Sequence, residues 1–385
     1  MDHNATTPVD PAVKAAMEPF LAEQFGNASS SSHALGWQAQ TAVRKAREQV
    51  ATLLGCDPSH VIWTSGATES NNLAILGLVR AFRGEKPHII TQATEHKAVL
   101  EVCEAAEEWG ADVTVIGVDR EGVIRLEELA AAITPRTVLI SIMMANNEIG
   151  TLQPVAEIAK LCRERKIVFH SDAAQSIGKC TIDFRTLSMD MLSISGHKLY
   201  GPKGVGALIL RPVNRDFELK PILFGGDQEK KLRPGTLNVP GIVGLGAACE
   251  VARVTMAEEC ARLCKFQTHI LEEVRSACPS LKLNGPVKPR LCNNLSFSFE
   301  GFASEDIALG FSGVAFSSGS ACNSGSAMPS HVLRAIGLDD ATARATLRLG
   351  LGRFTTASEV RVVTDKLLKM LSKMAPKMIH NKTNP

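Results

Sequence analysis

Seven short apolar runs alternate with helical segments between residues 61 and 210, and this alternation limits the possible folds of the 385-residue chain. Strands that alternate with helices form a mostly parallel sheet with helices on both faces. The sequence therefore predicts an α/β fold with a mostly parallel seven-stranded sheet. The predicted strands cover residues 61–63, 88–90, 113–118, 137–143, 167–170, 191–194 and 205–210. The predicted helices cover residues 11–23, 38–54, 73–79, 98–109, 126–133 and 155–164.

Polar side chains follow the ends of several of these strands. Crossovers between parallel strands are right-handed, which brings the strand ends to one edge of the sheet. Open α/β folds bind their ligands at that edge. We therefore expect one polar site, where six side chains meet. They are His96, Asn147, Asp172, Gln175, His197 and Lys198.

Lys198 closes the motif Ser195-Gly196-His197-Lys198, which ends a predicted strand and leads into a glycine-rich loop. A lysine amine that is partly removed from water, beside another cationic or hydrogen-bonding group, can be neutral enough to attack a carbonyl and form a Schiff base. Taken alone, this motif would favour a surface lysine in a turn. The other polar strand ends favour a reactive lysine.

The segment TSGATESNN, residues 64–72, joins a predicted strand to a predicted helix. Free backbone amides and the helix dipole make the start of a helix attractive to phosphate. The hydroxyl of Thr68 can add a further hydrogen bond. The pattern indicates a phosphate site, and a helix cap without a ligand is the common alternative.

An aldehyde cofactor with a phosphate and a pyridine ring would account for this whole set of residues. Lys198 would form the Schiff base, and Asp172 would keep the pyridine nitrogen protonated, which makes the ring an electron sink. His96 could stack on the ring and transfer protons, and Gln175 could bond the ring hydroxyl. Each residue alone has an ordinary structural explanation, but their combination at successive strand ends favours a site. The expected phosphate ligands are Thr68, Ser195 and His197.

The pattern of the chain changes near residue 251, where helices and short strands suggest a smaller α+β domain. A predicted helix over residues 257–277 is followed by short apolar segments and a last helix over 358–374. We expect a large cofactor-binding domain over residues 8–255. Residues 256–385, together with residues 1–7, would form the small domain.

Composition argues against several classes of partner. The net charge of +2 gives no electrostatic case for nucleic acid or a membrane surface. No apolar run reaches the length of a membrane span, and the chain does not open with a signal peptide. Ten cysteines without a Cys-x-x-Cys pair argue against a zinc or disulfide framework, so we expect no metal site. This cysteine usage suits reduced thiols in the cytoplasm.

Nearly the whole chain resembles the cysteine desulfurases of the NifS/IscS type, class-V aminotransferases with pyridoxal-phosphate fold type I. The resemblance implies pyridoxal 5'-phosphate as cofactor, with Ala67 among its ligands. It also implies that Asn147 and Arg348 bind the substrate carboxylate. Thr236 would reach the phosphate in a neighbouring subunit, which implies a homodimer. The matching segments are residues 2–8, 64–71, 95–96, 146–148, 172–176, 195–198, 233–236, 317–322 and 351–354.

Cys322 differs from the other cysteines because it lies in the glycine- and serine-rich segment 317–326. A thiolate on such a loop can attack a bound substrate and then carry its product away. The resemblance implies conversion of L-cysteine to L-alanine, with a persulfide formed on Cys322. Its sulfur would pass to an acceptor protein or scaffold for iron–sulfur cluster or other cofactor synthesis, with Cys322 a possible transient cluster ligand.

Three other functions compete with this interpretation. A selenocysteine lyase would share the cofactor site and the fold. A plain aminotransferase of the same fold would need no loop cysteine. A non-catalytic sulfur-relay or scaffold protein would have a degenerate site, which the presence of Lys198, Asp172 and His96 argues against.

Overall fold

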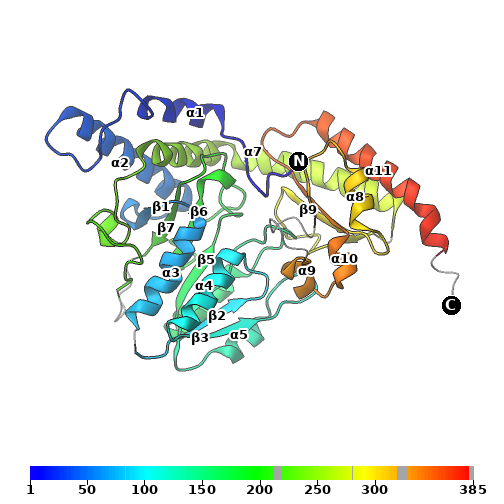
Figure 1. Ribbon diagram of the computed structural model, residues 1–385, viewed down its shortest axis with the longest axis horizontal. Coiled ribbons are helices and arrows are strands. Elements are labelled where there is room, and N and C mark those ends of the chain that lie inside the picture. The colour runs from blue at the N-terminus through cyan, green and yellow to red at the C-terminus, as the bar shows by residue number, and fades with distance from the viewer. Residues whose placement is uncertain (83, 212–217, 280, 319–327, 381–385) are drawn as a thin grey trace.

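A seven-stranded sheet forms the centre of the larger part of the molecule (Figure 1). The structure is a computed structural model that describes residues 1–82, 84–211, 218–279, 281–318 and 328–380. Strand order is β1-β7-β6-β5-β4-β2-β3, and β7 alone runs antiparallel to its neighbours. The predicted α/β class and the mostly parallel sheet are thus confirmed. The strands are β1 (Val61–Thr64), β2 (His88–Gln92), β3 (Asp112–Ile116), β4 (Thr137–Ser141), β5 (Val168–Asp172), β6 (Met191–Ser195) and β7 (Gly206–Leu210).

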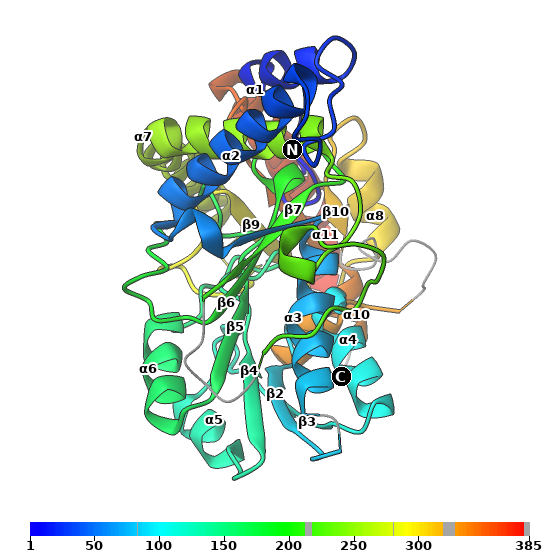
Figure 2. The same ribbon diagram turned by 90° about the vertical axis from the view of Figure 1, so that its left-hand side faces the viewer.

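Helices cover both faces of this sheet because successive strand residues point to opposite sides. Ile89 of β2 packs in the core beneath α3 and α4, whereas its neighbour Ile90 packs in the core beneath α2, α5, α6 and α7. Figure 2 shows α3 and α4 on one side of the sheet and α5 and α6 on the other. The helices are α2 (Ala34–Leu54), α3 (Ala67–Ala81), α4 (Lys97–Glu108), α5 (Leu126–Ala132), α6 (Val155–Arg165) and α7 (Val239–Ala277).

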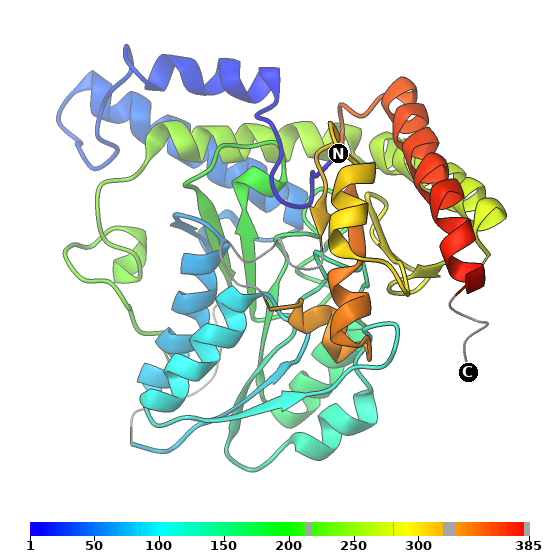
Figure 3. The same cartoon turned by 45° about the vertical axis from the view of Figure 1, so that its right-hand side comes forward.

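A four-stranded antiparallel sheet, in the order β10-β11-β9-β8, forms the smaller part of the molecule. The predicted smaller α+β part is confirmed. Its core lies between this sheet, the last turns of α7, and α8 and α11, which Figure 3 shows side by side. The elements are β8 (Lys282–Leu283), β9 (Asn294–Ser298), α8 (Ser304–Gly310), β10 (Ser317–Ser318), α9 (His331–Ala335), α10 (Asp340–Arg344), β11 (Thr346–Gly350) and α11 (Ala357–His380).

Helix α7 is 39 residues long and begins at Val239, so the predicted start at residue 257 is wrong. Its first half carries several glycines, which lower intrinsic helix propensity. The tertiary contacts need these glycines: a Cβ atom at Gly246 would lie 2.6 Å from the Cα atom of Ala46 in α2. Close packing against α2 therefore explains a helix that propensity does not indicate.

The same helix contributes to both cores, up to Ala252 in the larger one and from Leu263 in the smaller one. The domain boundary that we expect at residues 255–256 falls between these contacts, inside α7. By length and composition alone α7 could cross a membrane, although its apolar stretch includes Glu250 and Arg253. Half of that stretch is buried within the protein, and packing in the cores accounts for its apolar character.

The N-terminal segment runs between the two parts of the molecule and reaches the strand end that carries Lys198. The amide of His3 donates to the carbonyl of Gly350 in β11, and the amide of Thr7 donates to the carbonyl of His197. Helix α1 (Pro11–Met17) follows. The predicted helix over residues 11–23 ends early, in a 3-10 turn, because Pro19 has no amide to continue the helical hydrogen bonds.

Candidate active site

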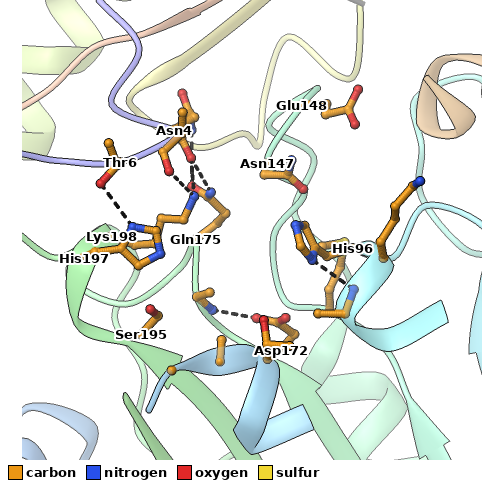
Figure 4. A pocket seen from close by; sticks show the side chains of 18 of the residues that line it. Asn4, Thr6, His96, Asn147, Glu148, Asp172, Gln175, Ser195, His197 and Lys198 are labelled. Atoms are coloured by element: carbon orange, nitrogen blue, oxygen red, sulfur yellow. Dashed lines mark hydrogen bonds between the residues drawn. The ribbon is translucent and has the colours of Figure 1, made fainter. Parts of the chain in front are cut away.

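A cavity of about 780 Å³ opens at the edge of the large sheet where β5 and β6 end (Figure 4). Its walls also include the first turns of α3 and α4, the N-terminal segment, and β10 and β11 of the small sheet. The cavity therefore lies between the two parts of the molecule. Ten residues predicted for the site line it: Ala67, Thr68, His96, Asn147, Asp172, Gln175, Ser195, His197, Lys198 and Arg348.

Lys198 ends the 3-10 turn that follows β6, and its side chain reaches the cavity. Its Nζ donates to the carbonyl oxygens of Asn4, at 2.6 Å, and Ala5, at 2.7 Å. Burial, with the positive charges of Arg348 and Lys179, lowers the pKa of this amine from 10.5 to about 8. A substantial share of the amine is therefore neutral, and nucleophilic, at mildly alkaline pH.

Asp172, at the end of β5, is a buried carboxylate with neutral partners. It accepts hydrogen bonds from Asn71 Nδ2, at 2.8 Å, and from the amide of Ala174, at 2.9 Å. Within the described residues, no side chain forms a salt bridge with it. A buried carboxylate without a counter-charge is costly. This arrangement suits a cationic ligand group in the cavity.

His96 is the N-cap of α4 and opens to the cavity. Its Nδ1 accepts a hydrogen bond from the amide of Ala98 at 3.1 Å, which leaves the proton of the neutral ring on Nε2. Burial lowers the pKa of the imidazole. The adjacent Glu95 is fully buried, and burial raises the pKa of its carboxyl well above the usual range.

The start of α3 forms the part of the cavity that favours an anion. Its N-cap is Gly66, and no side chain caps the helix. Ser195 lies close to this turn, because a Cβ atom at Gly66 would stand 4.0 Å from its hydroxyl oxygen. His197 Nδ1 lies 3.1 Å from Thr6 Oγ1. Burial and nearby lysines lower the pKa of the His197 imidazole to about 4, so the ring is neutral at neutral pH.

Arg348 enters the cavity from β11 of the small sheet. Its Nη2 donates to Asp2 Oδ1 at 3.0 Å and to Ser317 Oγ at 2.6 Å, and its Nη1 donates to the carbonyl of Asn147 at 3.2 Å. A guanidinium held this way binds carboxylates through paired hydrogen bonds. In the structure, the carboxylate on Arg348 is that of Asp2.

One described residue that we predicted for the site does not line this cavity. Thr236 is exposed between β7 and α7 and does not line the cavity. Cys322 lies outside the described residues.

Sequence reasoning also missed residues that organise the site. Asn71 lies within the segment TSGATESNN, but no local sequence pattern indicates that it bonds Asp172. Asn4 bonds both Lys198 and Gln175, with Gln175 Nε2 donating to the Asn4 carbonyl at 2.9 Å. His331 of α9 donates from Nε2 to the Glu95 carbonyl at 2.8 Å.

Comparison with known proteins places this site in a family. The model of the class-V aminotransferases matches residues 1–363. The chain belongs to the class-V aminotransferase family. A human protein named cysteine desulfurase is 47% identical over 382 residues, which are 98% of this chain and 83% of the relative. The resemblance to cysteine desulfurases is therefore confirmed.

Two solved structures show the same fold. A NifS-like protein superposes with a TM-score of 0.88 at 36% identity and covers 96% of this chain and 98% of its own. A structure described as SspA in complex with cysteine has a TM-score of 0.81 at 41% identity, covering 92% and 99% of the two chains. Both likenesses confirm the predicted pyridoxal-phosphate fold type I.

Class-V aminotransferases use pyridoxal phosphate, and the residues of the cavity fit that group. Lys198 would hold its aldehyde, and the start of α3 with Ser195 and His197 would hold its phosphate. The Asp172 carboxylate, buried and without a salt-bridge partner among the described residues, fits a protonated ring nitrogen. Once bound, the cofactor supplies an electron sink for the substrate Cα carbon.

Asp172→Asn in this class-V aminotransferase should lower turnover about 10²–10³-fold and weaken cofactor retention. The amide has the shape of the carboxylate, but it carries no negative charge to stabilise a cation. Alanine production from cysteine and the absorbance of retained cofactor measure the two effects. Asp365→Asn, on the exposed side of α11, is the matched control. Full activity in Asp172→Asn would contradict the assigned role.

The low pKa of Lys198 predicts how the apoprotein captures pyridoxal phosphate. The neutral amine attacks the aldehyde, so the capture rate should rise with pH up to about 8 and then level off. Arg348→Gln removes a positive charge that lowers this pKa, and it should move the profile to higher pH. The rate is followed by the absorbance of bound cofactor. A wild-type midpoint near 10.5, the ordinary lysine value, would show that the amine is not perturbed.

Proposed function

We propose that the protein is a pyridoxal-phosphate-dependent cysteine desulfurase, which converts L-cysteine to L-alanine and transfers the sulfur to Cys322. One observation carries the proposal: Lys198, Asp172 and Arg348 share one cavity, so an amine, a buried carboxylate and a guanidinium face the same ligand. The human relative of similar sequence, named cysteine desulfurase, supports this reaction.

Each residue has a task that its surroundings support. Arg348, with Asn147, would bind the substrate carboxylate in place of Asp2. Lys198 would remove the Cα proton onto Nζ, because its lowered pKa makes the neutral amine available. His96 would hold a proton at Nε2. The Cys322 thiolate would attack the substrate sulfur, so the carbon–sulfur bond breaks, a sulfur–sulfur bond forms, and Cβ takes up a proton.

The test of this function is the product balance. Purified protein with pyridoxal phosphate, L-cysteine and a thiol reductant should release alanine and sulfide in equal amounts. Without reductant, alkylation should trap a persulfide. An aminotransferase would instead form a keto acid and would require an amino-group acceptor. Formation of keto acid without alanine would overturn the proposal.

Selenocysteine lyase is the second candidate, because it would use the same cofactor residues. The relative described as SspA in complex with cysteine supports cysteine as the substrate. Turnover of L-cysteine and L-selenocysteine under the same conditions separates the two functions. A lyase would turn over selenocysteine and leave cysteine almost untouched.

We also propose that the enzyme is a homodimer in which Thr236 completes the phosphate site of the neighbouring subunit. The exposure of Thr236, away from its own cavity, supports this arrangement. We expect sedimentation to show a dimer, and Thr236→Ala to weaken cofactor retention because a hydroxyl ligand is lost. Thr52→Ala, on an exposed turn of α2, is the control. A monomer with full cofactor occupancy would contradict the proposal.

The same reaction requires an acceptor for the persulfide sulfur. We propose an acceptor protein or scaffold that takes the persulfide sulfur for iron–sulfur cluster or other cofactor synthesis, in the cytoplasm. The cysteine usage of the chain supports a reducing compartment. Transfer of radiolabelled sulfur from cysteine to a co-purified protein tests the acceptor, and cell fractionation tests the location.

A further inference from the structure

Two cysteine side chains meet in the core of the small part of the molecule. Cys260 lies on α7, and Cys292 lies in the segment that leads into β9. Their Sγ atoms are 3.1 Å apart, although 32 positions separate the residues in the chain. This separation is about 1 Å longer than a disulfide bond, ~2.05 Å. Small side-chain movements would therefore bring the sulfur atoms to bonding distance.

The two thiols have different surroundings. Cys292 is buried, with 6% of its surface exposed, in the core of the small part of the molecule. Cys260 is half-buried, so a small reagent can reach it from solvent. The Cys292 thiol donates to Cys260 Sγ. This hydrogen bond and the charge of Lys179 lower the pKa of the Cys260 thiol. The same hydrogen bond and burial raise the pKa of the Cys292 thiol.

These differences give the two cysteines separate chemical tasks. A thiolate is the nucleophile in thiol oxidation, and it must be accessible. Cys260 has the lower thiol pKa of the pair and the greater exposure. Cys292 is protected from solvent and stands in contact with Cys260, which is the position of a resolving thiol.

We propose that Cys260 and Cys292 form a reversible modification site, a dithiol that hydroperoxides oxidise to an intramolecular disulfide. The Cys260 thiolate attacks the peroxide, the oxygen–oxygen bond breaks, and Cys260 becomes a sulfenic acid as hydroxide or alkoxide leaves. The Cys292 sulfur then attacks Cys260 Sγ, and the disulfide forms as water leaves. The two sulfur atoms lose two electrons in total, and the peroxide gains them.

The dithiol is connected to the lysine of the active site through one residue. The Cys260 thiol donates to the carbonyl of Lys179 at 3.3 Å, and Lys179 Nζ donates to the carbonyl of Lys198 at 3.1 Å. Oxidation removes the thiol proton that bonds Lys179. The disulfide also joins α7 to the segment before Asn294. Asn294 Nδ2 donates to the carbonyl of Asn147 at 3.3 Å. The site therefore links oxidation to two segments that line the cavity.

Peptide mapping tests the proposal without reference to enzyme activity. Reduced protein is treated with equimolar hydrogen peroxide, quenched in acid, alkylated, and digested with trypsin and a glutamyl endopeptidase. Cleavage after Glu300 separates Cys292 from Cys322. We expect a peptide pair joined through Cys260 and Cys292, which becomes the main form of both residues after oxidation and disappears with dithiothreitol.

Matched variants show which thiols are required. Cys260→Ser and Cys292→Ser should lose the linked pair, and Cys264→Ser should keep it, because the exposed Cys264 lies one turn from Cys260. Cys322→Ala should also keep it. Wild-type protein decides the question by itself, even where a serine variant fails to fold. Three outcomes would overturn the proposal. Cys260 and Cys292 could both be alkylated after oxidation, Cys260 could be linked to another residue, or Cys260 could be oxidised irreversibly without a link.

Discussion

Lys198→Ala should lower the turnover of L-cysteine about ten-thousand-fold, the upper range for loss of a positioned acid–base group. The change removes the amine that would hold the cofactor aldehyde and take the Cα proton. In the described residues Lys179 also carries a buried amine, but its Nζ is engaged with the Lys198 carbonyl. We therefore expect that Lys179 does not replace Lys198.

Alanine formation, cofactor absorbance and circular dichroism measure this variant. Alanine lacks the hydrogen bonds to Asn4 and Ala5, so the N-terminal segment can loosen while the sheet stays folded. Lys160→Ala, on the exposed side of α6, controls for the loss of a lysine. A folded Lys198→Ala protein that turns over cysteine at the wild-type rate would refute the assignment.

Cys322→Ala should abolish persulfide formation and sulfide release while the protein still binds cofactor and cysteine. The expectation rests on the sequence, because Cys322 lies outside the described residues. Lys198, Asp172 and Arg348 are unchanged in this variant, so the substrate should still enter and change the cofactor absorbance. Because the variant lacks the Cys322 thiol, the substrate sulfur has no acceptor. The reaction should therefore stop before alanine leaves.

Mass spectrometry of alkylated protein locates the persulfide in the wild type. Cys264→Ala is the matched control, since Cys264 is an exposed cysteine on α7. It should release sulfide at the wild-type rate. Persulfide on another cysteine, together with continued sulfide release by Cys322→Ala, would contradict the role assigned to Cys322 in the desulfurase mechanism.

The order of strands and helices was predictable from the sequence because it depends on local patterns. Short apolar runs, glycine turns and polar strand ends are read over a few residues, and the right-handed crossover then places the ends together. This reasoning brought Asp172, His96 and Lys198 to one edge of the sheet, where the cavity lies. Their roles remain predictions for the experiments above.

Contacts between distant segments could not be predicted in the same way. The bond from Lys198 to Asn4 spans 194 positions, that from Asn71 to Asp172 spans 101, and that from Arg348 to Asp2 spans 346. No local pattern marks such pairs, because each depends on how whole elements pack. The resemblance supplied Arg348 for the site, and only the structure supplied its partner Asp2.

The sequence by itself determined the α/β class, the edge of the sheet that holds the site, and the residues that could react there. Tertiary structure alone decided the start of α7 and the meeting of Cys260 with Cys292. Glycines that lower helix propensity are kept in α7 because neighbouring helices leave no room for a side chain. Local conformational preference depends on residues close in sequence, whereas close packing depends on residues from distant segments. Where the two disagree, packing decides the fold.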